Sequence, residues 1–230
     1  MFRTASPTAL AADVLPQLTD PQLAAAAKLA FVAEQPGAVA VLCGPAGVGK
    51  TTVLGYVIAM GLPGDPVIRG GTLAGLSDLD AHGGDHGAGL PDVLLVDDAH
   101  RAAATDLVEF VDRWRRRHAA VVIVLAGEGR LLSLAARDPR LEQSVRLRVA
   151  IPPFSLAESV RVLADRLPAA TVGAGHEAVV RTIHEIAGGV PKLVLRLADI
   201  AAVLAQADPS RGVVPDDIET IHRRLCLQAA

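Results

Sequence analysis

One stretch of the sequence has the residue types and the spacing of a phosphate-binding loop. From residue 44 to residue 51 it reads Gly-Pro-Ala-Gly-Val-Gly-Lys-Thr, which matches the pattern G-x-x-x-x-G-K-[ST] in full. Glycines let such a loop turn its backbone N–H groups toward phosphates, and the N-terminus of the next helix adds partial positive charge. The residues expected to bind the phosphates of a nucleotide are Gly44, Pro45, Ala46, Gly47, Val48, Gly49, Lys50, Thr51 and Thr52. We expect the Lys50 ammonium to act in catalysis on the β- and γ-phosphates and the Thr51 hydroxyl to bind Mg²⁺.

A pair of carboxylates follows a second apolar run. Residues 93–96 read Val-Leu-Leu-Val, and Asp97 and Asp98 come directly after them. We expect Asp97 to hold Mg²⁺ through water and Asp98 to polarise the attacking water as a catalytic residue. The alternative interpretation is a strand that ends in two solvated acids. The spacing to the phosphate loop favours the nucleotide site, although aspartate is one methylene shorter than glutamate and holds a water less well.

The elements around these residues alternate between strand and helix. Short apolar runs at 38–43, 93–96, 121–125 and 145–151 predict buried parallel strands. Helices are expected over 19–34, with Leu23, Ala27, Ala30 and Phe31 on its apolar face, over 51–60, and over 105–117, with Leu107, Val108, Phe110, Val111 and Trp114 at helical spacing. The alternation predicts an α/β fold, a three-layer P-loop arrangement around a parallel sheet.

Two other segments differ from this pattern. Residues 61–91 hold nine glycines in 31 positions and are expected to be loop, apart from a brief strand candidate at 66–69. After Pro152 and Pro153 the pattern is wholly helical, with candidates at 155–167, 177–187, 192–206 and 215–227 and a Ser-x-x-Glu cap at Ser155. The expected domains are therefore an N-terminal tail at 1–18, a nucleotide-binding α/β core at 19–153 and a helical lid at 154–230.

Composition narrows the class of protein. The 230 residues are 51% hydrophobic, 20% charged and 3% aromatic, which excludes a disordered chain and leaves few rings for stacking on nucleobases. Residues 101–150 hold ten basic and six acidic side chains, against four and ten in residues 1–100. Two distant cysteines, no apolar run of membrane-spanning length and no signal peptide predict a cytoplasmic protein.

Six motifs occur in the order and approximate spacing of those in AAA+ ATPases: residues 44–51, 97–101 (Asp-Asp-Ala-His-Arg), 125–128 (Leu-Ala-Gly-Glu), 141–146, 151–155 (Ile-Pro-Pro-Phe-Ser) and 188–192 (Gly-Gly-Val-Pro-Lys). From about Leu18 onward the sequence resembles this family, and within it the ExeA/GspA and TniB-like branch. The Pro-Pro and Gly-Gly-Val-Pro-Lys elements carry the branch resemblance. The ExeA-type membrane span and peptidoglycan-binding extension have no counterpart in the sequence.

The resemblance implies further roles. Lys192 falls at the family's sensor 2 position, which implies that it binds nucleotide from the lid. Arg146 falls near the arginine that acts catalytically on a neighbouring subunit's nucleotide, and Arg140 and Arg148 are alternatives for that role. The sequence departs from the family at Asp98, normally glutamate, and at Glu128, the sensor 1 position, whose charge would repel a γ-phosphate. These departures predict slow or partner-stimulated turnover.

Three functions follow from the resemblance. The first is a Mg²⁺-dependent ATPase that couples its nucleotide state to assembly or remodelling of an unknown protein partner, as in secretion, and that forms a homo-oligomeric ring or filament. The second is a DNA-targeting transposition helper, which only the basic middle segment encourages. The third is a nucleotide-gated switch with little turnover. The basic cluster at 113–118 is interpreted as a solvated helix end or as a partner or nucleic-acid patch. His82, Asp85 and His86 form a weak metal-site candidate.

Overall fold

The computed structural model of the chain describes residues 18–81, 90–167, 175–208 and 210–228. Contacts divide the chain into two compact units. The first comprises Met1–Pro45 and Gly49–Ile151, and the second comprises Ala46–Val48 and Pro152–Ala230. The predicted tail at 1–18 lies outside the described residues except for its last residue.

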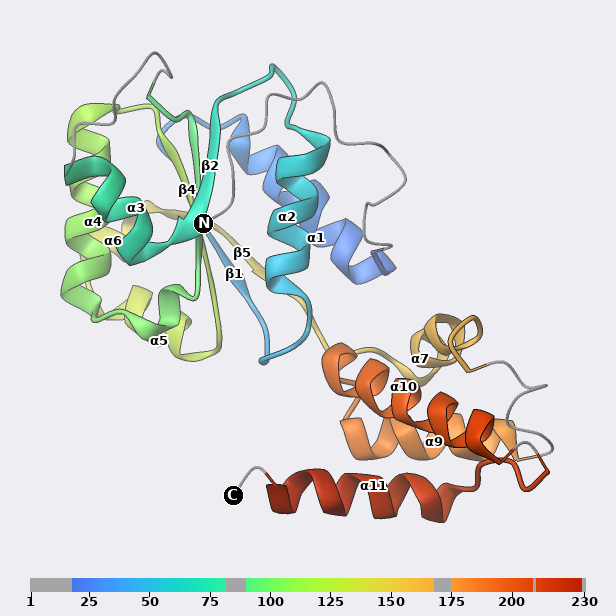
Figure 1. Cartoon of the computed structure of the whole chain (residues 1–230). Helices are drawn as coiled ribbons and strands as arrows, with labels where there is room; N and C mark the ends of the chain where they lie inside the picture. Colours follow the sequence, from blue (N-terminus) through green and yellow to red (C-terminus); the bar gives the residue numbers. More distant parts are fainter. Residues whose placement is uncertain (1–17, 82–89, 168–174, 209, 229–230) are drawn as a thin grey trace. The chain divides into compact units, whose positions relative to one another are not determined.

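A parallel sheet forms the centre of the first unit (Figure 1). Its strands are β1 (Val39–Cys43), β2 (Ile68–Thr72), β3 (Val93–Asp97), β4 (Val122–Gly127) and β5 (Val145–Ala150). Their order across the sheet is β2-β3-β4-β1-β5, and every neighbouring pair is parallel. All residues of β1 and β4 and all but the last of β3 are buried, as expected for apolar strands covered on both faces.

Helices cover both faces of the sheet. In Figure 1, α1 (Asp20–Ala33) and α2 (Lys50–Met60) lie on one side of it. The other side carries α3 (Leu73–Ala81), α4 (Ala104–Arg117), α5 (Arg130–Arg137) and α6 (Pro139–Ser144). A short 3₁₀ helix, η2 (Ala99–Arg101), joins β3 to α4. These three layers confirm the predicted fold class.

The apolar face predicted for residues 105–117 is confirmed in α4. Its buried residues are Leu107, Val108, Phe110, Val111 and Trp114. They join β1, β3 and β4 side chains in one core cluster, in which the Phe110 and Trp114 rings lie 6.3 Å apart between centroids. This burial of apolar side chains against the sheet stabilises α4.

The face predicted for the first helix is wrong. Leu23 and Ala27 are exposed, and Phe31 is 62% exposed, whereas Ala30 is half-buried. The helix instead buries Gln22, Ala25, Ala26, Leu29 and Val32. Because alanines lie on every side of α1, composition alone did not distinguish the two faces.

The loop predicted over residues 61–91 is also partly wrong. Residues 68–72 form β2, although two of its five residues are Gly70 and Gly71, and residues 73–81 form α3. Strand β2 is held by pairing with β3 in register Ile68 to Val93. A neighbouring strand far away in the sequence therefore overrides the weak local preference of glycine.

Four helices make up most of the second unit. They are α7 (Leu156–Leu163), α9 (His176–Ala187), α10 (Pro191–Ala207) and α11 (Pro215–Gln228), and they agree with the four predicted helices. The cap at Ser155 is also confirmed, because its N–H and hydroxyl each donate to Glu158 Oε2 at 2.8 Å. Side chains of all four helices fill the core of this unit. No helix within the described ranges has both the length and the apolar character needed to cross a membrane.

Candidate nucleotide-binding site

The phosphate loop connects the carboxyl end of β1 to the first turn of α2. Gly47 and Gly49 have φ angles of 81° and 98°, which side chains with a Cβ rarely adopt. Gly49 is the N-cap of α2, and its carbonyl accepts the first helical hydrogen bond, from the Val53 N–H at 2.9 Å. The backbone conformation therefore requires glycine at two positions of the sequence pattern.

Lys50 is the first residue of α2 and is only 8% exposed. Its Nζ donates to the carbonyl oxygens of Gly44 and Pro45, each at 2.9 Å. The ammonium thus lies against the start of the loop, and phosphate oxygens would compete with these two carbonyls for it.

Thr51 and Asp97 meet although they are 46 residues apart in the sequence. The Thr51 hydroxyl donates to Asp97 Oδ2 at 2.6 Å, and the Asp98 N–H donates to Asp97 Oδ1 at 2.8 Å. Two oxygen atoms that could coordinate a metal ion, one from α2 and one from β3, therefore lie side by side. Hydroxyl and carboxylate oxygens are the hard donors that Mg²⁺ takes, so this pair fits the metal predicted from the sequence.

Asp98 turns away from the strand that precedes it. Its φ of 53° is left-handed, and its carboxylate lies 3.5 Å from Arg101 Nε at 44% exposure. The arginine is itself mostly exposed. Asp98 is thus close to Asp97 in sequence, but its side chain pairs with a surface cation.

A second carboxylate occupies the end of β4, the strand between β1 and β3. Gly127, its last residue, pairs with Cys43 and accepts a hydrogen bond from the Gly44 N–H at 3.3 Å. Glu128 follows it, with its Oε1 3.5 Å from His100 Nε2. The sequence marked Glu128 only as a departure from the family, and this contact with His100 was not predicted.

Gln22 is a further residue at the loop that the sequence reasoning missed. It is buried in the first turn of α1, and its Oε1 accepts from the Thr19 N–H at 3.0 Å. A Cβ placed on Gly49 would lie 2.5 Å from Gln22 Nε2. Side-chain packing therefore opposes a larger residue at Gly49, in addition to the strain from its φ. The Thr-x-x-Gln cap signal at 19–22 was the one sequence feature that could have placed Gln22 at a fixed position.

Lys192 is an exposed residue at the start of α10. Within the second unit, its backbone N–H donates to the Gly47 carbonyl at 3.1 Å. A Cβ on Gly47 would lie 2.9 Å from the Lys192 Cβ and 3.1 Å from a Val190 methyl. The nucleotide role of the Lys192 side chain stays a prediction.

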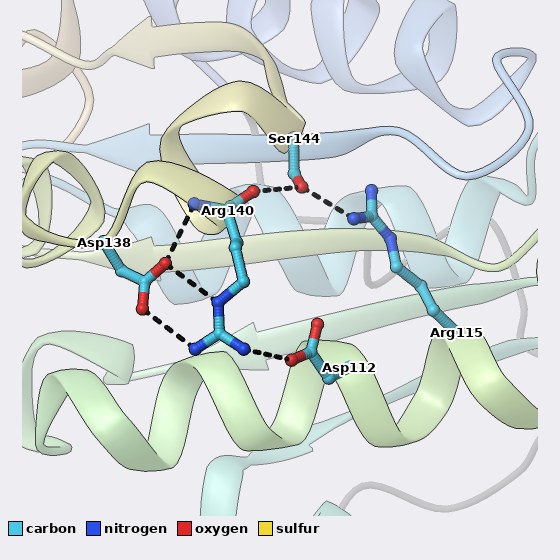
Figure 2. Close-up of polar contacts among 5 residues, drawn as sticks. All are labelled: Asp112, Arg115, Asp138, Arg140 and Ser144. Atoms are coloured by element: carbon cyan, nitrogen blue, oxygen red, sulfur yellow. Dashed lines mark hydrogen bonds and ion pairs between the residues drawn. The ribbon is translucent and has the colours of Figure 1, made fainter.

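The three candidate arginines differ in their contacts. Figure 2 shows Arg140 between Asp138, at 3.1 Å, and Asp112, at 3.2 Å. Hydrogen bonding and charge from Arg140 lower the pKa of Asp138, and the carboxylate in turn raises the pKa of Arg140. Arg148 pairs with Glu142.

Arg146 has a different environment on β5, which is an edge strand. The pairing of β5 with β1 shifts between Val145 and Leu147, so Arg146 is the extra residue of a β-bulge. Arg146 is exposed, and within the described ranges its side chain makes no hydrogen bond or ion pair. Of the three arginines, it is therefore the one whose guanidinium is available to another molecule.

The basic cluster at 113–118 contributes to internal packing. Arg115 donates to the Ser144 hydroxyl at 2.6 Å and to the Gly37 carbonyl at 2.5 Å, and Ser144 donates onward to the Arg140 carbonyl (Figure 2). His118 Nδ1 lies 3.2 Å from the Pro91 carbonyl. These contacts tie the end of α4 to α6 and to the segments before β1 and β3.

Two smaller features bear on metal and redox chemistry. Cys43 is buried before the loop, and burial raises the pKa of its thiol despite the opposing Gly44 N–H and Lys50 charge. The metal-site candidate of His82, Asp85 and His86 lies outside the described residues. Among the residues that are described, no three His, Cys, Asp or Glu side chains cluster as metal ligands.

Solved structures of other proteins share this architecture. ORC2 of Aeropyrum pernix, solved as ADPNP–ADP complexes, has a TM-score of 0.60 and 17% identity over 91% of this chain and 69% of that chain. Hsp104 of S. cerevisiae, solved with casein, has a TM-score of 0.62 and 19% identity over 92% of this chain. RuvB of Thermotoga maritima, a Holliday junction branch migration motor, has a TM-score of 0.56 and 16% identity over 86% of this chain.

The chain has the AAA+ P-loop fold. The match spans only 42% of the Hsp104 chain and 67% of the RuvB chain, so the similarity covers a part of each of these AAA+ proteins. No family model and no curated protein matches the sequence. The ExeA/GspA and TniB-like branch within the AAA+ fold therefore stays a prediction.

Proposed function

We propose that this chain binds Mg·ATP, hydrolyses it, and uses its nucleotide state to control assembly on, or remodelling of, a protein partner. The observation that carries the proposal is the 2.6 Å hydrogen bond from Thr51 to Asp97. It joins the residue after the phosphate-loop lysine to the first acid of β3. A hydroxyl and a carboxylate at these two points are the donors that phosphoryl-transfer sites use.

The chain's own groups divide the work at this site. Lys50 exchanges its two carbonyl partners for β- and γ-phosphate oxygens, and the N-terminus of α2 stabilises their negative charge. Thr51 and Asp97 hold Mg²⁺, which supplies charge neutralisation on the phosphates when bound. Asp98 is the acid that the sequence offers for polarising water. Lys192 is proposed to bind nucleotide, and Arg146 to act on the nucleotide of a neighbouring subunit.

The test of the nucleotide chemistry compares two lysine variants. K50A removes the ammonium at the loop, whereas K28A removes one from an exposed position of α1. Affinity for a fluorescent ATP analogue and phosphate release are measured with and without Mg²⁺. We expect K50A to lose turnover and most of the affinity, and K28A to keep both. Equal turnover in K50A and the unsubstituted protein would overturn the ATPase proposal.

Contacts of the basic middle segment favour a protein partner over DNA. Arg115, Arg140 and Arg148 are bound to groups of the same chain, so fewer cations are available for DNA phosphates than their number implies. Arg146 is unpaired in the described structure and suits a nucleotide-dependent contact between subunits. Turnover with and without duplex DNA, together with oligomeric mass in Mg·ATP, separates the alternatives. Stimulation by DNA would select a DNA-targeting ATPase, and an inactive monomer would select a nucleotide-gated switch.

A further inference from the structure

Two acids, Asp98 and Glu128, follow neighbouring strands of the sheet. Their positions in the sequence do not decide which carboxylate accepts the proton of the attacking water. Asp98 follows β3 but turns into a left-handed conformation and pairs with Arg101. Glu128 follows β4, which lies between the strand of the phosphate loop and the strand of Asp97. A side chain at the end of the middle strand is next to both elements that bind Mg·ATP in the proposed function.

The backbone before and after Glu128 is fixed relative to the loop. Gly127 pairs with Cys43, and its carbonyl accepts from the Gly44 N–H at 3.3 Å. The Glu128 carbonyl accepts from the Leu131 N–H at 2.8 Å, which closes the turn into α5. Glu128 therefore directly follows the residue whose carbonyl is bonded to the first residue of the phosphate loop, and it has one methylene more than Asp98 with which to reach a water.

His100 contacts this carboxylate, and packing against Gly127 holds the histidine in place. Its side chain is 13% exposed, and its Nε2 is 3.5 Å from Glu128 Oε1. A Cβ on Gly127 would lie 3.0 Å from the His100 Cβ and backbone nitrogen, so the glycine at 127 makes the room that the histidine occupies. In the part of the chain that the structure describes, His100 Nδ1 is buried without a hydrogen-bond partner. Because a carboxylate can only accept, a hydrogen bond at the contact with Glu128 has Nε2 as its donor.

We propose that Glu128 is the catalytic carboxylate of hydrolysis and that His100 is its positioning residue. This inference rests on the proposed ATPase function and deepens it. The water oxygen forms a bond to the γ-phosphorus while the bond from that phosphorus to the bridging oxygen breaks and ADP leaves. The proton of the water passes to the Glu128 carboxylate and then to solvent. His100 Nε2–H donates to the other carboxylate oxygen and turns the side chain toward the water, since such contacts tighten when substrate is bound.

Charge alone suggests a different role for Glu128, in which its carboxylate repels the γ-phosphate. The two readings predict opposite results for E128Q, which removes the charge and the proton acceptor but keeps the shape. If Glu128 is catalytic, E128Q lowers kcat about 100-fold or more and leaves Mg·ATP affinity unchanged within about 3-fold, the range for loss of a general base. If Glu128 repels phosphate, E128Q raises affinity and does not lower kcat.

The experiment uses the full chain and measures phosphate release and affinity for the fluorescent ATP analogue. E109Q makes the same change at an exposed position of α4 and is expected to keep wild-type values. H100L removes the donor to Glu128, and we expect it to lower kcat about 10-fold with little change in KM. H100Q places an amide N–H near the Nε2 position and should restore most of the loss. D98N should lower kcat less than E128Q.

Three results would overturn the assignment: a kcat of E128Q equal to or above wild type, a larger loss in D98N than in E128Q, or equal losses in H100L and H100Q. Fluorescence of Trp114 in urea checks that each variant is folded. The proposed function is judged separately by K50A. If the wild type hydrolyses ATP and K50A does not, the ATPase proposal stands, whether or not E128Q changes kcat.

Discussion

Two glycines of the phosphate loop and its helix should respond in opposite directions to the same substitution. Gly49 has a φ of 98°, and a Cβ on it would lie 2.5 Å from Gln22 Nε2. Gly55 lies in the middle of α2, and a Cβ on it would meet nothing within 4 Å. G49A and G55A thus add the same methyl group at positions six residues apart. At Gly49 the methyl group meets an unfavourable backbone conformation and the Gln22 amide, whereas at Gly55 it enters open space.

The structure sets the size of each effect. An alanine in the left-handed region costs about 1–2 kcal/mol. Gln22 is buried, so moving its amide also breaks the 3.0 Å bond from Thr19, worth about 0.5–1.5 kcal/mol. G49A should therefore destabilise the first unit by about 2–3 kcal/mol. G55A should stabilise it by about 0.5–1 kcal/mol, because glycine is a poorer helix former than alanine.

Urea unfolding followed by tryptophan fluorescence measures both changes in the relevant unit. Trp114 is the single tryptophan of the chain and is buried in the core of the first unit, which contains α2. With a slope of about 2 kcal/mol per M urea, the midpoint should fall by about 1–1.5 M in G49A and rise by about 0.3–0.5 M in G55A. In a Q22A background the cost of G49A should drop to that of the backbone strain. A midpoint of G49A at or above wild type, or of G55A below it, would refute this reasoning.

Two further predictions concern Arg115 and Cys43. R115A should destabilise the first unit by about 1–3 kcal/mol through its lost bonds to Ser144 and the Gly37 carbonyl, whereas R116A, at an exposed neighbouring position, should change the urea midpoint little; equal effects would contradict the internal role of Arg115. Because burial raises the pKa of the Cys43 thiol, its contribution is fully present below the pKa of the unfolded thiol and is lost as the pH rises toward the folded value. The urea midpoint of the wild type should therefore fall more steeply than that of C43A as the pH rises above the pKa of an unfolded thiol, about 8.5, and parallel curves would show that the thiol is not the cause.

Strong local patterns were enough to predict most of the first unit. The strands at β1, β3 and β4 are continuous apolar runs, and the spacing in α4 marks all five of its buried residues. The phosphate loop and Asp97 could be placed relative to one another because parallel strands bring their carboxyl ends to one edge of a sheet. The contact between Thr51 and Asp97 agrees with that placement.

What sequence reasoning missed depends on neighbours far away in the chain. Strand β2 exists because β3 offers it a parallel edge, although its own residues include Gly70 and Gly71. The buried face of α1 consists of Gln22, Ala25, Ala26, Leu29 and Val32 and leaves the apolar residues Leu23 and Phe31 exposed, because α1 packs against α2 and the sheet. The contact of His100 with Glu128 joins two strand ends that are 28 residues apart, and neither residue type nor spacing indicates it.

The bulge at Arg146 has a consequence beyond its proposed role in a nucleotide contact. As an edge strand, β5 presents backbone groups that could pair with a strand of another molecule and extend the sheet from chain to chain. The extra residue breaks the regular spacing of those groups, and Arg146 places an exposed charge at the same edge. The arginine proposed to contact a neighbouring subunit thus also discourages aggregation of the folded chain through this edge. An Arg146 variant should accordingly be assayed for turbidity at high concentration as well as for turnover.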